Sequence, residues 1–170
     1  MSAYKTMKRT FIREYKERAP QYKARLIEWS RQGPVVMAGK PTNIPRAREL
    51  GYRAKEGVLV ARVAVRKGRR MRPAVGGGRK PSKGGRFFSR AKSLQVIAEE
   101  KAARKFSNLE VLNSYFVGET GERRFYEVIM LDRSSPSVKT DPKLAAVASH
   151  TARAQRGLTS AGMKARGFRA

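Results

Sequence analysis

The clearest hydrophobic periodicity in the chain lies between Ser89 and Phe106. Apolar residues recur there every three or four positions, which is the spacing of one face of an α-helix. They are Leu94, Ile97, Ala98, Ala102 and Phe106. Ser89 or Ser93 is expected to cap the first turn. The adjacent Glu99 and Glu100 point to different sides, so we expect a solvated helix face rather than a facing acid/base pair.

Three other stretches are rich in β-branched and aromatic residues, which favours strands. One runs from Val58 to Val65, and two begin at Leu109 and Arg124 with the turn sequence GETGE between them. The last two are expected to pair as a hairpin. The order of strand, basic loop, helix, strand and strand predicts an α+β fold, in which a helix packs on a small antiparallel sheet.

The two ends of the chain have different patterns. The first 32 residues predict two short amphipathic helices, and Asn43–Gly51 predicts one or two further helical turns. After Asp141 there is no acidic residue, and glycines recur every five positions, which predicts an extended basic arm. We therefore expect a basic helical extension at 1–56, an α+β core at 57–141 with a basic glycine-rich loop at 66–88, and a C-terminal arm at 142–170.

Charge changes this picture most. The chain has 39 lysines and arginines against 13 acidic residues, a formal net charge of +26. Residues 99–141 hold eight acidic and seven basic residues and net −1, so the rest of the chain carries +27. Such an excess destabilises a compact chain unless a polyanion neutralises it. A nearly neutral core with cationic extensions that bind nucleic acid is the arrangement this distribution favours.

The segment Arg66–Arg86 concentrates the charge. It contains nine basic residues, six glycines, two prolines and no acidic residue. Alone it should be a self-repelling loop, because it has little apolar surface to bury. Small residues let its main chain approach a phosphate backbone, which arginine binds with two hydrogen bonds. Of the aromatic residues at its end, Phe88 is expected in the core. Met71 and Val75 are candidates to anchor the loop.

Several classes of function lack the residues they need. There is no cysteine, which excludes disulfides, zinc knuckles and thiol catalysis. The longest apolar run is the five residues Leu144–Ala148, against roughly 20 for a membrane span, and the N-terminus lacks the apolar core of a signal peptide. The single histidine, His150, has no carboxylate nearby in the sequence, and no phosphate-binding loop is found. We expect no enzyme, no cofactor, no metal site and no small-molecule substrate; any structural Mg²⁺ would belong to bound RNA.

Four blocks carry a family resemblance: ARELGYRAKEGVLVARVAVRKG from Ala47, LNSYFVGE from Leu112, FYEVIMLD from Phe125 and RGLTSAGMKARG from Arg156. In this order they closely resemble the archaeal and eukaryotic large-subunit ribosomal protein fifteen. The resemblance implies a structural, non-catalytic, rRNA-binding constituent of the large ribosomal subunit that supports translation, is cytoplasmic within the ribosome and contacts neighbouring ribosomal proteins. The chain departs from the family pattern at DPKLAAVASHTARAQ. It ends at Ala170, where members of this family usually continue with a further basic tail.

We therefore predict a ribonucleoprotein component, of archaeal type, that binds large-subunit ribosomal RNA. The alternative is a free nucleic-acid-compacting or RNA-chaperone protein, which composition alone favours nearly as well. An RNA-modifying enzyme is a further alternative, but it would need a cofactor site, and none is found. The predicted RNA-binding residues are Arg53, Lys55, Arg66, Lys67, Arg69, Arg70, Arg72, Arg79, Lys80, Lys83, Arg86, Arg90, Arg156, Lys164, Arg166 and Arg169.

Overall fold

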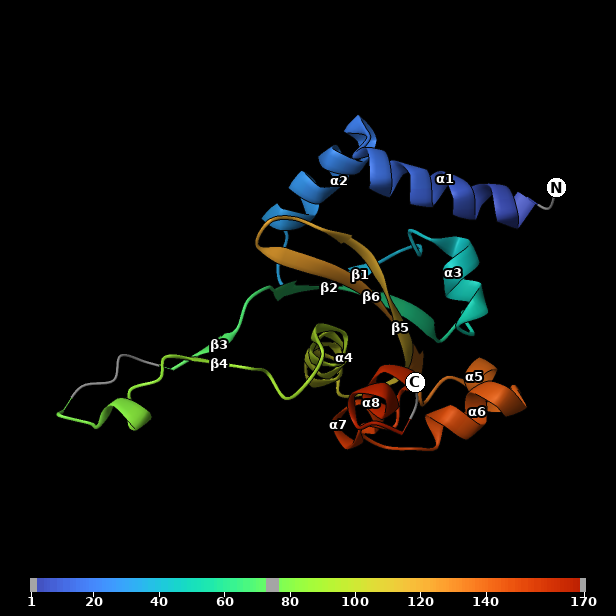
Figure 1. The fold of residues 1–170 in the computed structure, drawn as a ribbon. Coiled ribbons are helices and arrows are strands. Elements are labelled where there is room, and N and C mark those ends of the chain that lie inside the picture. The colour runs from blue at the N-terminus through green and yellow to red at the C-terminus, as the bar shows by residue number, and fades with distance from the viewer. Residues whose placement is uncertain (1–2, 73–76, 169–170) are drawn as a thin grey trace.

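A four-stranded antiparallel sheet forms the centre of the molecule (Figure 1). The computed structural model describes residues 3–72 and 77–168. The strands are β1 (Val35–Ala38), β2 (Val58–Arg66), β5 (Leu109–Glu119) and β6 (Arg123–Asp132), in the order β1-β2-β6-β5. The predicted α+β class, the strand at Val58 and the hairpin that follows the helix are all confirmed. β1 was not predicted.

Strand β6 shows why the sheet is stable. Every residue from Phe125 to Leu131 is buried, so both faces of this strand are covered. Phe125, Ile129 and Leu131 belong to the core cluster on one face. Tyr126, Val128 and Met130, at the alternate positions, belong to the cluster on the other. Each such side chain contributes about 1.5–3 kcal/mol when fully buried. The sheet is therefore the middle layer of three.

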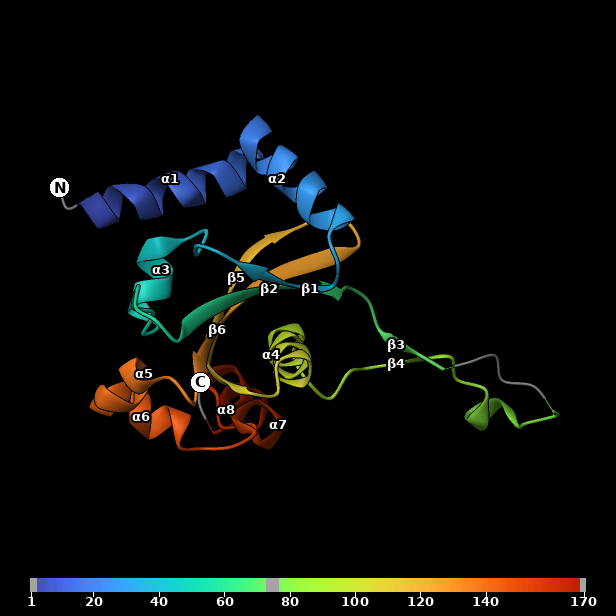
Figure 2. The ribbon, with the colours of Figure 1, turned by 180° about the vertical axis from the view of Figure 1, so that it is seen from behind.

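The N-terminal helices cover one face (Figure 2). They are α1 (Ala3–Glu17), α2 (Pro20–Arg31) and α3 (Ile44–Glu49), as the sequence predicted. Tyr22, Leu26 and Trp29 of α2 are buried against the sheet. No residue of α1 is buried; its Tyr15 is partly buried and makes edge contacts with the rings of Tyr22 and Phe116, at centroid distances of 5.8 and 5.6 Å.

Helix α4 (Leu94–Lys105) covers the opposite face. It begins at Leu94, because the Oγ of Ser93 accepts a hydrogen bond from the Val96 N–H at 3.3 Å and so caps the first turn. The expectation of a solvated face at Glu99 was wrong, since Glu99 is 0% exposed. Its neighbour Glu100 is partly exposed and pairs with Lys92 at 2.5 Å.

The prediction of an extended C-terminal arm was also wrong. The segment 142–170 follows α5 (Pro136–Thr140) and forms α6 (Pro142–Ala148), α7 (Arg153–Arg156) and α8 (Ser160–Ala165), and it packs on the core. Its glycines make close turns instead of an extended chain. Gly157 ends α7 at φ +67°, and a Cβ at Gly162 would lie 2.7 Å from the Gly157 Cα, so only glycine fits there.

Buried polar groups fix this C-terminal segment to the sheet and to α4. The hydroxyls of Ser114 and Thr159 donate to the two carboxylate oxygens of Glu99, both at 2.5 Å. Nearby, the N–H of Arg153 donates to Glu110 Oε1 at 3.0 Å, and its guanidinium donates to the Val111 carbonyl at 2.6 Å. Burial raises the pKa of Glu99, although both hydroxyl bonds and the charge of Arg153 act against this shift.

Replacing Glu99 with glutamine should therefore stabilise the protein relative to wild type increasingly as pH rises. The folded protein holds the Glu99 proton above the ordinary pKa of 4.5, and the unfolded chain releases it there. The free energy of unfolding of wild type consequently falls between pH 4.5 and the folded pKa, and Glu99→Gln lacks this loss. Urea unfolding at several pH values measures the difference. Glu100→Gln is the matched control, and an identical trend in it would contradict the assignment.

Gly118 of β5 lies against α2 and should not tolerate a side chain. A Cβ there would be 2.8 Å from the Tyr22 hydroxyl and 3.1 Å from Leu26. Gly118→Ala should cost about 1–3 kcal/mol of unfolding free energy through overpacking. Gly121→Ala is the control, since nothing lies within 4 Å of its Cβ position. Denaturation followed by the fluorescence of Trp29 measures both, and equal losses would refute the packing explanation.

Candidate nucleic-acid interface

The basic loop projects from the body as a narrow arm (Figure 1). It leaves the sheet at the end of β2 and forms a two-residue ladder between β3 (Arg70–Met71) and β4 (Phe87–Phe88). A 3-10 turn, η1 (Pro81–Lys83), lies further out. Among the described residues 66–72 and 77–88 none is buried. The arm therefore has local backbone bonds but no core of its own, as its composition predicted.

Phe88 is used within the arm. The expectation that it lies in the core was wrong, because it belongs to neither core cluster and is only partly buried. The Arg72 guanidinium lies over its ring at 4.1 Å from the centroid. A Cβ at Gly85 would lie 3.3 Å from the ring. Phe88 thus braces the ladder, which the sequence pattern did not reveal. Val75 lies outside the described residues.

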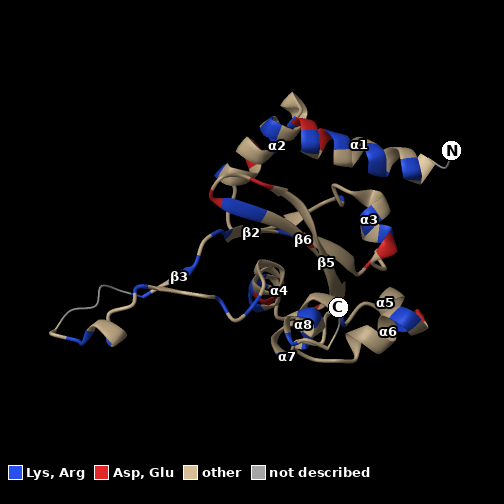
Figure 3. Cartoon of the chain, in the orientation of Figure 1, with Lys and Arg blue, Asp and Glu red and all other residues tan. Residues whose placement is uncertain are grey.

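Most predicted RNA-binding residues gather on this arm (Figure 3). Arg66, Arg69, Arg70, Arg72, Arg79, Lys80, Lys83 and Arg86 are exposed. Lys67 and Arg90 are partly buried where the arm joins the body. Arg90 donates to the Arg66 carbonyl at 3.3 Å, which holds the two ends of the arm together. Within the described part of the chain, Lys67 is the only cation of the segment 66–90 with an ion pair, to Glu119 at 3.1 Å.

Glu119 is the carboxylate that stabilises the place where the arm meets the β5–β6 hairpin. It also pairs with Arg124 at 2.8 Å. Partial burial acts to raise the pKa of Glu119, but hydrogen bonds from Arg124 and Lys67 outweigh it and hold the pKa below its usual range. The carboxylate is therefore charged at neutral pH and offsets the directly opposed pair Arg66 and Arg123.

Lys101 of α4 indicates a positive electrostatic potential near the base of the arm. Its ammonium donates to the Ala64 carbonyl at 3.3 Å. Partial burial lowers the pKa of Lys101, and the surrounding charges, led by Arg104 and Arg90, lower it further. A cation depressed by other cations marks a positive potential that attracts anions. Lys101 was missed from the sequence because it lies in the segment whose net charge is nearly zero.

The other predicted residues do not join the arm. Arg53 and Lys55 pair with Asp141 at 2.8 and 3.6 Å, so the body already partly neutralises them. Arg156, Lys164 and Arg166 are exposed on or next to α7 and α8. There Arg166 lies over the ring of Phe168 at 4.7 Å. Arg169 lies outside the described residues. Arg156, Lys164 and Arg166 form a separate basic patch on the body.

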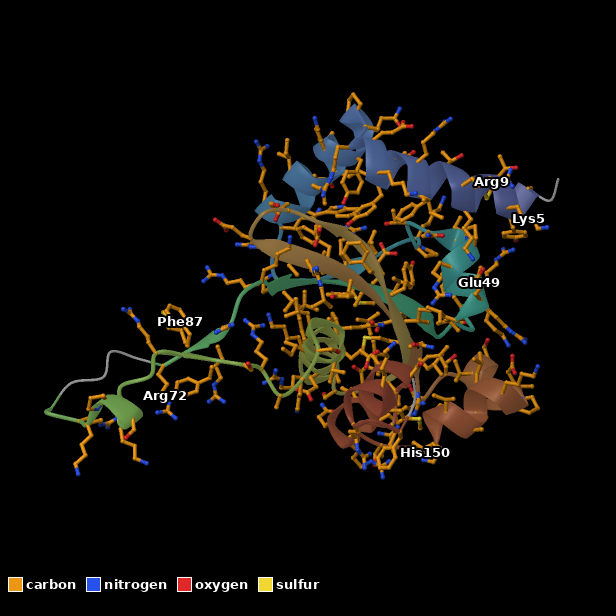
Figure 4. All side chains as sticks on the ribbon, viewed as in Figure 1. Lys5, Arg9, Glu49, Arg72, Phe87 and His150 are labelled. Carbon is orange, nitrogen blue, oxygen red and sulfur yellow. The ribbon has the colours of Figure 1, made fainter. Side chains whose placement is uncertain are left out.

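Two further basic surfaces were not among the predicted residues. Helix α1 is exposed along its length and carries Lys5, Lys8, Arg9, Arg13 and Lys16 (Figure 4 labels Lys5 and Arg9). A hollow of about 560 Å³ is lined by the cations Arg133 and Lys139 and by the polar groups of Asn108, Ser134 and Ser149. The charge of α1 was readable from the sequence. The hollow was not, because packing assembles it from distant segments.

No alternative chemical site emerges. Within residues 3–72 and 77–168, no group of three or more histidine and carboxylate side chains is placed to hold a metal ion. His150 is exposed at the end of α6 (Figure 4). Of the helices in these same two ranges, none has the length and apolarity to cross a membrane. In the described residues, the molecule presents cations on an arm and on several patches of the body.

Comparison with known proteins agrees with this arrangement. Residues 2–170 match the family described as Ribosomal L15. The chain is 49% identical over 152 residues to "Large ribosomal subunit protein eL15" of Picrophilus torridus, covering 88% of this chain and 78% of the relative. It is 51% identical over 145 residues to the protein of the same name from Methanocorpusculum labreanum, covering 85% of this chain and 75% of the relative.

The outer arm should contribute to polyanion binding in proportion to its charge. Replacing Arg79, Lys80 and Lys83 together with alanine should lower the slope of log affinity against log salt by about 2–3, because roughly 0.7–0.9 counterions are released for each phosphate contact. Fluorescence anisotropy with polyadenylate RNA measures this slope. Arg79→Lys keeps the charge and should keep the wild-type slope. An unchanged slope in the triple variant would exclude the outer arm from binding.

Proposed function

The chain belongs to the ribosomal L15e family, and on that premise we propose that it serves as a structural component of the large ribosomal subunit by binding and stabilising ribosomal RNA. The observation that carries this proposal is the arm. The cations of the arm project well away from the sheet. Of those among the described residues, only Lys67 has a carboxylate partner. A partner outside the chain is needed to neutralise them.

Energetics support an RNA partner for the arm. Ordering the backbone of one residue costs about 1–2 kcal/mol, and none of the arm's described residues, 66–72 and 77–88, is buried to offset this cost. Contacts with phosphate supply the missing free energy. Arginine and lysine displace the counterions condensed on the RNA and bond directly to its phosphates. The body contributes the opposite property. Its sheet is covered on both faces, so it gives the arm and the basic patches a fixed origin.

The three basic regions have different roles in this proposal. The arm is narrow enough to enter spaces between RNA segments that are too narrow for the body. Helix α1 and the patches on α7 and α8 bind RNA along the outside of the body. Neighbouring large-subunit proteins are the second class of partner. We assign the chain no catalytic step, no cofactor and no metal ion.

Replacing Arg69, Arg70 and Arg72 together with alanine tests the proposal. Incorporation into large subunits should fall by at least about tenfold, equivalent to about 1.4 kcal/mol, because three guanidinium groups lose their phosphate contacts. Sedimentation of subunits from cells that express the tagged variant measures incorporation. The triple lysine variant at the same positions keeps the charge and separates its effect from that of the guanidinium geometry.

A high-salt wash distinguishes the alternative function. An architectural component should remain with large subunits after the wash, since its arm is enclosed by folded RNA. A free nucleic-acid-compacting or RNA-chaperone protein should be released, because only surface electrostatics would hold it. Release of the wild-type chain, or normal incorporation of the triple alanine variant, would contradict the proposal.

A further inference from the structure

The arm carries an apolar pair that has no role within the arm itself. Met71 and Phe87 face each other across the β3–β4 ladder and are 56% and 61% exposed. Arg70, Arg72 and Phe88 occupy the alternate positions, where Arg72 covers the ring of Phe88. Figure 4 shows Phe87 and Arg72 on opposite sides of the ribbon. The ring of Phe87 is therefore open on a segment surrounded by cations.

Met71, but not Phe87, also lines a hollow where the arm meets α4. Its volume is about 510 Å³, which is in the range of sites that hold small ligands. Four cations line it, together with the apolar side chains of Met71 and Ile97, and no carboxylate does. The cations are Arg69, Arg70, Arg90 and Lys92. We call this hollow with Phe87 the arm root.

The chemistry of the arm root selects among polyanions. Arginine and lysine offer only donors, and Ser89 is the one lining side chain with an oxygen acceptor. A bound acidic peptide would find only one side-chain acceptor here for its backbone N–H groups, and each group left buried without a partner costs about 1–3 kcal/mol. A nucleotide presents phosphate and base acceptors to the donors. The flat base of the nucleotide can stack on an exposed phenylalanine ring, and all four bases can stack in this way.

We propose that the arm root receives one unpaired nucleotide of RNA. The base stacks on Phe87 beside Met71, and the adjoining phosphates contact Arg69, Arg70 and Arg90. This inference rests on the proposed function, namely that the arm binds RNA, and adds where and how the arm reads an unpaired base. Fully paired helices satisfy the cations but offer no base to the phenylalanine.

The test compares two RNA hairpins that differ only in one bulged 2-aminopurine. The wild-type chain should bind the bulged hairpin more tightly, and the fluorescence of the 2-aminopurine should change as it stacks. Phe87→Ala should weaken binding of the bulged hairpin about 5- to 100-fold, the usual effect of losing one base–aromatic stack. Binding of the fully paired hairpin and the salt dependence should remain as in wild type, since no cation is removed. Phe87→Tyr should bind like wild type.

Ile27→Ala is the matched control, since Ile27 is similarly exposed, at 56% against 61% for Phe87, but lies on α2. It should bind both hairpins as wild type does. Equal binding of the bulged hairpin by Phe87→Ala and wild type would overturn the inference while leaving the proposed function intact. A parallel loss on the paired hairpin would also overturn it, because Phe87 would then only support the arm. Preference of wild type for polyglutamate over both hairpins would overturn the inference and the proposed function together.

Discussion

Repulsion among 39 cations is the constraint that shapes this molecule, and only 13 carboxylates are available to offset it. Several lie where one segment joins another. Glu99 accepts hydrogen bonds from a hydroxyl of β5 and from a hydroxyl of the C-terminal segment. Glu127 is 0% exposed and accepts the Thr42 N–H at 2.9 Å, which ties the segment before α3 to β6. Glu119 stabilises the base of the arm. The body is therefore held together by a few buried or partly buried acids as well as by its apolar core.

The arm represents the opposite solution to the same constraint. It contains no acid, and its described residues bury no core; they are ordered by a two-residue ladder, by the turn η1 and by one guanidinium over one ring. Order in the body is paid for by burial of apolar side chains. We propose that order in the arm depends on the phosphates of bound RNA. The division between the two lies at the end of β2, where the continuous buried pattern stops at Val65.

The sequence predicted those features of the fold that depend on residues close together in the chain, and it missed those that depend on residues far apart. Helix α4 and the β5–β6 hairpin were predictable because their periodicity and turn residues are local. Strand β1 has four residues and pairs Val35 with Val63, a contact that no local pattern signals. The folded C-terminal segment was missed because the burial of Leu144, Ala148 and Ala154 in the core depends on residues far away in the sequence. The burial of Glu99 was missed because its partners lie 15 and 60 residues away. Among the candidate site residues, the exposed cations of the arm followed from composition, whereas the pairing of Arg53 with Asp141 did not.

The closeness of the two ends of the arm has an evolutionary consequence. The chain leaves the body at Arg66 and returns at Arg90, and the hydrogen bond between these residues fixes both ends whatever lies between them. Doubling the length of such an insertion costs only about 0.6 kcal/mol of closure entropy. The outer part can therefore lengthen, shorten or change its order of glycines and arginines without disturbing the sheet, so that it can follow changes in the surface it meets while the body stays the same.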